Sequence, residues 1–126
     1  MAKEVVATPH APAAIGPYSQ AIKANGFVFT AGQIALDPST AMIVGTDVRT
    51  QTERVCENLK AILTQAGTGF DKVVKTTVFL KTMDDFAAMN EVYGRYFTQP
   101  APARSTVAVV TLPKNVLVEI DVVALA

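Results

Sequence analysis

The run Val73-Val74-Lys75-Thr76-Thr77-Val78-Phe79-Leu80 decides the fold of this chain. Its apolar and β-branched residues are nearly continuous, which is typical of a strand buried on both faces of a sheet. We expect this strand to span residues 72–81. Because segments with helical periodicity lie on both sides of it, the run predicts a sheet in which strands and helices alternate along the chain.

Two helices flank this strand. The apolar residues of 48–66 recur at helical spacing, with Asp47 or Thr46 as the cap and Gly67 as the stop. A second helix is expected over residues 83–98, where the same spacing returns. Its apolar stripe consists of Phe86, Met89, Tyr93 and Phe97.

Turn signals define the remaining strands. Asn25-Gly26 is a hairpin signal that pairs residues 21–23 with a strand over 27–36. A short return strand and two C-terminal strands follow, over residues 42–44, 105–112 and 116–125. The expected order is β-β-α-β-α-β-β. This order predicts a single α+β domain over residues 1–126, with a mixed sheet and two helices packed on one face.

The second face of this sheet is apolar as well, through Phe27, Phe29, Val73 and Phe79. No third long helix is expected that could cover it. We therefore expect another copy of the chain to do so, in an oligomer whose sheets face inward.

The composition narrows the class of protein. Of the 126 residues 50% are hydrophobic and 17% charged, and the formal net charge is zero. These values argue against a disordered chain. The eleven Lys and Arg are scattered and form no basic run, so a dedicated nucleic-acid surface is not expected.

Targeting signals are missing from the sequence. Residues 1–8 lack the pattern of a signal peptide, and no apolar stretch is long enough to span a bilayer. The single cysteine, Cys56, excludes an internal disulfide, which suits a reducing compartment. We expect a cytoplasmic protein. An organelle is the alternative if a transit peptide has been removed.

Two charged residues lie in segments that are otherwise typical of buried sheet, Arg104 in residues 102–107 and Glu119 in residues 117–122. A buried charge is expensive unless it is paired or used. The planar fork of a guanidinium can grip a carboxylate, and a carboxylate can activate a water molecule. The alternatives are an internal salt bridge between the two, or a solvated sheet face that carries Glu119 and Asp121.

Three further positions could contribute to a site. Asn90 interrupts the apolar stripe of the second helix, so its amide either holds a neighbouring loop or contacts a ligand. Tyr18 follows the turn at Gly16-Pro17 and is either a lid or the edge of the core. Gly32 interrupts a strand, which indicates a bulge, a close backbone approach or simple packing.

Metal and cofactor chemistry find little support. His10 is the only histidine and lies in a proline-rich lead-in, so neither a Ser-His-acid triad nor a metal site is expected. The glycines form no phosphate-cradling loop. Cys56 has apolar helical neighbours and is interpreted as a core thiol. We expect no cofactor.

In its motifs the chain resembles the RidA-type enamine/imine deaminases, also called the L-PSP endoribonuclease family. The matching segments follow one another in the order residues 13–20, 31–34, 73–78, 102–105 and 118–120. The resemblance extends over nearly the whole chain.

The resemblance implies a chorismate-mutase-like fold and a homotrimer with ligand clefts between subunits. It also implies that Arg104 grips the substrate carboxylate and that Glu119 positions the attacking water. The other substrate-binding positions that it implies are Tyr18, Ala31, Gly32, Asn90 and Thr106. Two of these depart from the family pattern, because many members have serine at the position of Ala31 and cysteine at that of Thr106.

The activity implied by the resemblance is hydrolytic deamination. The substrates would be 2-aminoacrylate-type enamines and 2-imino acids, as for a 2-iminobutanoate/2-iminopropanoate deaminase, and the products 2-keto acids and ammonia. Small 2-imino or 2-keto carboxylates and further copies of the chain are the expected partners. The alternatives are an endoribonuclease and a non-catalytic trimer that binds small carboxylates. The preferred imino acid and a role in metabolite damage control stay open.

Overall fold

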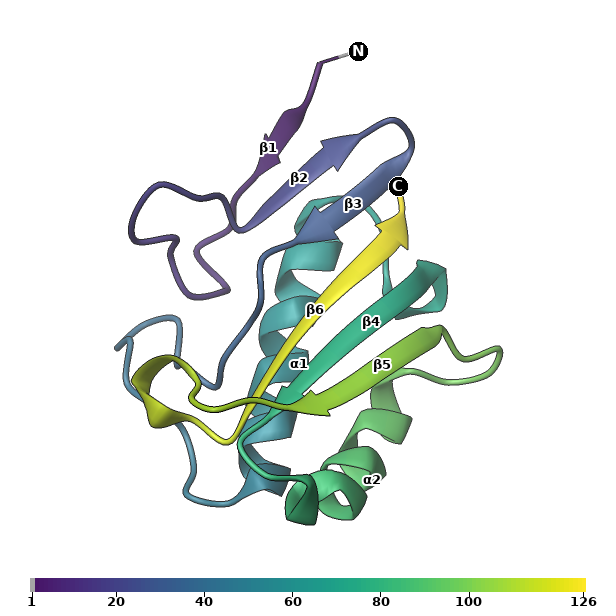
Figure 1. The fold of residues 1–126 in the computed structure, drawn as a ribbon. Helices are drawn as coiled ribbons and strands as arrows, with labels where there is room; N and C mark the ends of the chain where they lie inside the picture. The colour runs from purple at the N-terminus through teal and green to yellow at the C-terminus, as the bar shows by residue number, and fades with distance from the viewer. Residues whose placement is uncertain (1) are drawn as a thin grey trace.

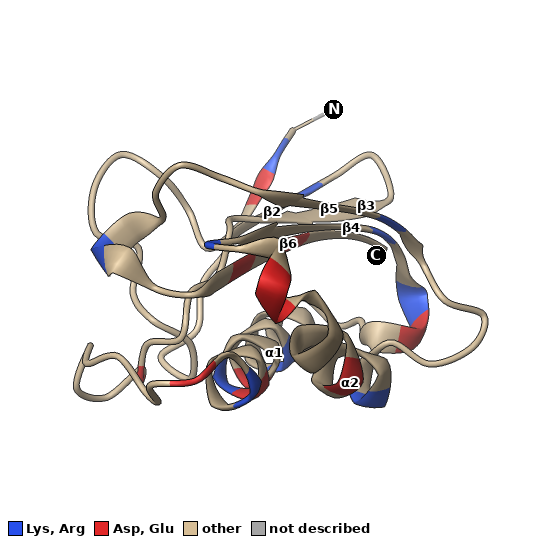
Figure 2. Cartoon of the chain, turned by 60° about the horizontal axis from the view of Figure 1, so that its bottom comes forward, with Lys and Arg blue, Asp and Glu red and all other residues tan. Residues whose placement is uncertain are grey.

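The computed structural model describes residues 2–126, and the strand expected over residues 72–81 is its β4, Val73–Leu80. This strand lies within a six-stranded sheet of order β1-β2-β3-β6-β4-β5 (Figure 1). The other strands are β1 (Glu4–Val6), β2 (Ala21–Ala24), β3 (Phe27–Thr30), β5 (Ala103–Ala108) and β6 (Val118–Leu125). Two helices, α1 (Val48–Gln65) and α2 (Phe86–Tyr96), pack on one face of the sheet (Figure 2).

The sheet is mixed, as expected. All neighbouring strands are antiparallel except β4 and β5, which are parallel and are connected through α2. Since β3 and β4 are both antiparallel to β6, they run parallel to each other with β6 between them, and α1 connects them. The α+β class with two helices on one face is therefore confirmed.

Both helices form where the apolar periodicity predicts them. Asp47 caps α1, because its carboxylate accepts a hydrogen bond from the Thr50 amide at 2.8 Å. The second helix is shorter than the expected 83–98. Residues Met83–Asp85 form a separate 3₁₀ turn before it, and Phe97 leaves helical geometry at its end.

The strand boundaries differ more from the expectation. The strand expected over residues 27–36 ends at Thr30, and residues 42–44 contribute only a bridge between Leu36 and Ile43. β5 begins at Ala103 rather than 105 and ends at Ala108 rather than 112, and β6 begins at Val118 rather than 116. A strand at residues 4–6 was missed, since three residues carry too little alternation to be recognised and are fixed only by pairing with β2.

A bulge explains the early end of β3. Phe29 pairs with Val123 and Gln33 pairs with Ile120, so the β3 side contains one residue more than β6 between the two pairs. The Thr30 hydroxyl accepts a hydrogen bond from the Val122 amide at 3.1 Å. This amide would otherwise have no partner where the bulge interrupts the backbone pairing. The chain therefore leaves the sheet just before Gly32.

The core lies between the sheet and the helices. Side chains alternate along β6 as predicted, and Val118, Ile120 and Val122 are at most 1% exposed toward the helices. Cys56 of α1 is completely buried among them, which confirms its assignment as a core thiol. Burial is the main cause that raises the pKa of its thiol far above the usual range.

The opposite sheet face carries exposed apolar side chains. Phe29, Val107 and Leu125 are each more than 40% exposed. The expectation for Val73 is wrong, because a register irregularity between Val73 and Lys75 turns this side chain into the core and leaves Val74 outside instead. The face thus carries exposed apolar residues, although not all of those that the sequence suggested.

Asn58 fastens the segment after the bulge to α1. Its amide nitrogen donates to the carbonyls of Ile34 and Leu36 at 3.2 and 3.0 Å, and its oxygen accepts from Arg54 Nε at 3.1 Å. The side chain is completely buried. Since the chain is irregular here, this amide supplies donors that a sheet would otherwise provide.

We predict that Asn58→Ala lowers the free energy of unfolding by about 1–3 kcal/mol, because two partly buried carbonyls lose their donor. Chemical denaturation measures this loss. Lys60→Ala is the control, since Lys60 lies on the exposed side of α1. Equal stabilities of the two variants would contradict the anchoring role of Asn58.

Candidate functional site

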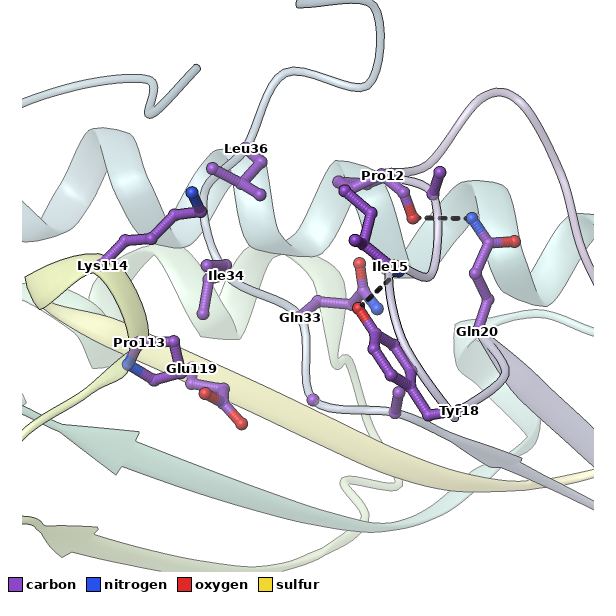
Figure 3. A pocket seen from close by; sticks show the side chains of 13 residues that line it. Pro12, Ile15, Tyr18, Gln20, Gln33, Ile34, Leu36, Pro113, Lys114 and Glu119 are labelled. Carbon is purple, nitrogen blue, oxygen red and sulfur yellow. Dashed lines mark hydrogen bonds between the residues drawn. The ribbon is translucent and has the colours of Figure 1, made fainter. Parts of the chain in front are cut away.

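A cavity of about 540 Å³ lies beside the start of β6 (Figure 3). Its walls come from three segments that are far apart in the sequence, namely the lead-in before β2, the bulged segment after β3, and the turn before β6. Most of the lining is apolar. The polar and glycine positions among the lining residues are Tyr18, Gln20, Gly32, Gln33, Lys114 and Glu119.

Gly32 makes room for the carboxylate of Glu119. A methyl group at Gly32 would lie 2.8 Å from Glu119 Cδ, which is closer than side-chain carbons approach other atoms. The glycine thus permits a close approach, one of the possibilities that its position in the sequence left open, and a larger residue here would force the Glu119 side chain to shift. The approaching group is the acid side chain of the neighbouring strand.

The environment of Glu119 favours its protonated form. Burial, and secondarily the nearby charge of Asp121, raise the pKa of Glu119. Burial also raises the pKa of Asp121, although the Thr77 hydroxyl and the Lys75 ammonium act in the opposite direction. A raised pKa makes a carboxyl group a better proton acceptor, which suits a general acid-base group.

Gln20 holds the lead-in, the irregular segment before β2, in place beside the cavity. Its side-chain oxygen accepts the Thr8 amide at 2.7 Å, and its nitrogen donates to the carbonyls of Thr8, Ala11 and Pro12 at 2.7 to 3.3 Å. The side chain is only 4% exposed. Sequence reasoning missed this residue, because the partners of a buried amide lie 8 to 12 residues away and leave no local pattern.

Tyr18 forms one wall of the same cavity. Its hydroxyl accepts the Ile15 amide at 3.3 Å, and its side chain is 55% exposed. Ala31 also lines the cavity. The candidates Tyr18, Ala31, Gly32 and Glu119 are thus brought together in one chain. Tyr18 and Glu119 are labelled in Figure 3.

Arg104 lies on the other face of the sheet. It pairs with Thr76, whose side chain points to the helices. Its Nη1 donates to Asn90 Oδ1 at 2.6 Å. The guanidinium carbon lies 4.7 Å from the ring centroid of Tyr93 and 5.4 Å from that of Phe86. Asn90 therefore holds the arginine.

Thr106 shares this face with Arg104, two residues further along β5. Within residues 2–126 its Oγ1 is buried and has no hydrogen-bond partner. The candidates Arg104, Asn90 and Thr106 form a second group, which we call the arginine group. We call Glu119 with Tyr18, Ala31 and Gly32 the glutamate group.

The two groups do not meet within one chain. Glu119 pairs with Phe79 and points away from the helices, whereas Arg104 points toward them. The internal salt bridge considered from the sequence is not formed, because the ion pairs in the described part of the chain are Arg49–Glu91 and Arg95–Glu91. One chain therefore presents two separate groups of candidate residues.

His10 takes part in neither group. It lines a different hollow, on the outer side of α1 together with Arg54 and Lys60. No cluster of potential metal ligands occurs in residues 2–126. Neither of the helices in this range has the length and apolarity needed to cross a membrane.

Comparisons with known proteins agree on one family. A family model described as Endoribonuclease L-PSP matches residues 8–126. A RutC family protein of Synechocystis is 60% identical over 126 residues, with 98% of this chain and 97% of the relative covered. The chloroplastic Reactive Intermediate Deaminase A of Arabidopsis thaliana is 50% identical, covering 97% of this chain and 65% of the relative. A mouse 2-iminobutanoate/2-iminopropanoate deaminase is 43% identical, covering 97% and 90%.

Solved structures give the same result. A member of the Rid protein family from Yersinia pestis superposes with a TM-score of 0.97 at 48% identity, covering 99% of this chain and 100% of the other. TdcF of E. coli, solved with bound serine, has a TM-score of 0.91 at 42% identity, and 98% of each chain is covered.

The raised pKa of Glu119 predicts a pH-dependent stability. Because the folded chain holds this proton more tightly than the unfolded chain, ionisation of Glu119 destabilises the fold as the pH rises. We expect Glu119→Gln to have a higher Tm than the wild type at neutral pH. The difference should shrink as the pH falls below the raised pKa of Glu119 in the folded chain, and it should vanish below the unfolded-state pKa of about 4.3.

Thermal unfolding followed over this pH range measures the effect. Glu91→Gln is the matched control, since Glu91 is an exposed acid whose carboxylate is engaged by Arg49. A Tm difference that does not vary with pH would show that burial of the Glu119 charge is not its cause.

Proposed function

The chain belongs to the Endoribonuclease L-PSP family, and from this premise we propose that it hydrolyses 2-aminoacrylate-type enamines and 2-imino acids to 2-keto acids and ammonia. Two relatives, 50% and 43% identical over the matched residues, are named as deaminases of reactive intermediates or of 2-iminobutanoate/2-iminopropanoate. Their names support the reaction class. The substrate and the residue roles given below are part of the proposal.

The main support for the proposal is the way in which the Arg104 guanidinium is held. Its guanidinium is held by an amide oxygen and two aromatic faces, and no carboxylate among residues 2–126 pairs with it. A guanidinium offers five N–H donors, of which Asn90 occupies one. The remaining donors suit the carboxylate of a small ligand, in two parallel hydrogen bonds.

A homotrimer would join the two groups. In this proposal the arginine group of one copy faces the glutamate group of its neighbour, so that Arg104 and Glu119 reach the same ligand from different chains. The exposed apolar residues of the open sheet face, Phe29, Val107 and Leu125, support burial of this face between copies. The cleft between subunits would then be the active site.

The proposed reaction starts with the imino acid clamped through its carboxylate by Arg104, which orients the adjacent C=N carbon. Glu119 accepts a proton from a water molecule as the oxygen attacks this carbon, and a proton passes to the nitrogen. The resulting carbinolamine loses ammonia as the C–N bond breaks and the C=O bond forms. Orientation and proton transfer are sufficient, because imines also hydrolyse in water without help.

The two departures from the family pattern would act at this cleft. Ala31 supplies no hydroxyl on the glutamate side, whereas Thr106 provides a buried hydroxyl without a partner on the arginine side. A buried donor of this kind is satisfied most simply by a ligand or a water molecule. We therefore propose that polar contacts to the substrate come mainly from the arginine group.

The family description names an endoribonuclease, which keeps this second candidate under consideration. A ribonuclease needs an acid-base pair and a route for phosphates. Neither group contains a histidine, and the formal net charge of the chain is zero. The deaminase is therefore the better supported function. A non-catalytic trimer that binds small carboxylates would use Arg104 in the same way and leave Glu119 without a task.

We predict that Arg104→Ala raises the KM for imino acids at least tenfold or abolishes turnover, since the carboxylate loses its clamp. The assay couples a threonine dehydratase to the protein and follows loss of the imine by semicarbazide trapping. Arg95→Ala is the control, because Arg95 forms only a surface ion pair on α2. Wild-type kinetics in Arg104→Ala would exclude the clamp.

We predict that Glu119→Gln lowers kcat by about 10²–10⁴-fold while ligand binding is largely retained, because the amide cannot accept the proton of the water. The same assay gives kcat, and calorimetry with 2-ketobutyrate gives binding. Asp121→Asn, on the same face of β6 but outside the cavity lining, should keep most of the activity. Full turnover in Glu119→Gln would mean that the water is activated by another group.

A further inference from the structure

We propose that Tyr93 is a positioning residue for Arg104, which fixes the plane of the guanidinium so that its free edge faces the ligand. This inference rests on the proposed function only in that Arg104 binds a carboxylate. Tyr93 belongs to the apolar stripe of α2, where its spacing suggests nothing but a place in the core.

The ring of Tyr93 is the nearer of the two aromatic faces at Arg104. Its centroid lies 4.7 Å from the guanidinium carbon, compared with 5.4 Å for Phe86. A guanidinium over an aromatic face is attracted by the ring, and it keeps its N–H groups in the plane, where they can donate. Contact with the face of the ring therefore occupies none of the donors in the guanidinium plane.

Tyr93 is itself fixed from two sides. Its hydroxyl shares a buried hydrogen bond of 2.7 Å with Thr76 Oγ1, and Thr76 is the residue of β4 that pairs with Arg104. On α2 the ring stacks on Phe97, with centroids 4.3 Å apart. At 5% exposure the tyrosine has no room to turn away.

An aromatic column continues behind this stack. Phe97 meets Phe70 edge to face at 5.0 Å, and Phe70 contacts Tyr96 at 5.5 Å. The hydroxyl of Tyr96 donates to Glu57 of α1 at 2.8 Å. The guanidinium is thus the last member of an aromatic column whose far end, Tyr96, is hydrogen-bonded to α1.

Asn90 and Tyr93 divide the task of holding Arg104. The amide oxygen accepts from Nη1 within the guanidinium plane, and the ring supports the plane from one side. Together they define both the tilt and the rotation of the group. The same arrangement would be useless for a lysine, whose ammonium has no plane.

This difference provides the test, a double-mutant cycle between Tyr93 and Arg104. Tyr93→Met removes the ring at similar volume, and Tyr93→Phe removes only the hydroxyl. Each is made in the wild type and in Arg104→Lys. The measurements are the Kd for 2-ketobutyrate by calorimetry, and KM and kcat for imine hydrolysis.

We expect Tyr93→Met to raise Kd and KM about three- to thirtyfold in the wild-type background, with a much smaller change of kcat. In the Arg104→Lys background of the double-mutant cycle, Tyr93→Met should change Kd less than twofold. Tyr93→Phe should bind almost like the wild type although it loses the bond to Thr76. If Tyr93 had a purely structural role, Tyr93→Met and Tyr93→Phe would change Kd by similar factors. Each factor would also be the same in the wild type and in Arg104→Lys. This result would overturn the inference.

Two controls keep the outcomes separate. Tyr96→Phe changes the far end of the column and should leave Kd unaltered. If Tyr93→Met does not fold, Phe86→Met takes its place, because it removes the second ring beside Arg104. An unchanged Kd in Phe86→Met, together with normal binding by Tyr93→Phe, would count against a role of the rings.

The inference and the proposed function can fail independently. Coupling between Tyr93 and Arg104 in ketobutyrate binding without any imine hydrolysis would support the positioning role and refute the deaminase. Imine hydrolysis without coupling would refute the positioning role alone. A wild-type protein that binds no 2-ketobutyrate would overturn the inference together with the carboxylate role of Arg104.

Discussion

The alternation of side chains along β6 is the constraint on which the rest of the structure depends. This strand pairs with β3 on one side and β4 on the other, so its geometry is shared by both halves of the sheet. Its valines and isoleucine must face the helices, because they form the centre of the core. Glu119 is thereby forced onto the opposite face, where neither helix covers it.

The same constraint separates the two charged candidates. Arg104 lies on the helix face of an edge strand, and Glu119 lies on the other face, so one chain cannot use both on one small ligand. A second copy that covers the open face solves two problems at once. It would bury the exposed apolar residues of that face, and it would bring an arginine group to a glutamate group. Assembly and activity are therefore linked in the proposed function.

Each group is built around close contacts made by residues that carry no charge. Gly32 allows the Glu119 carboxylate to lie against the backbone, and Gln20 holds the lead-in that closes the cavity. On the other face, Tyr93 and Asn90 hold Arg104. The small number of charged groups fits the proposed reaction, which needs only orientation and proton transfer. It also explains why most of the site looks like ordinary core in the sequence.

The sequence by itself determined the α+β class, the two helices, the strand at residues 73–80 and the face on which Glu119 lies, because these follow from local periodicity and turn chemistry. Its motifs also pointed to the family and to the candidate residues. Only the tertiary structure decided the bulge at Gly32, the pairing of β1 and the aromatic support of Arg104. These depend on contacts between residues that are distant in the chain, whose energies no local pattern records.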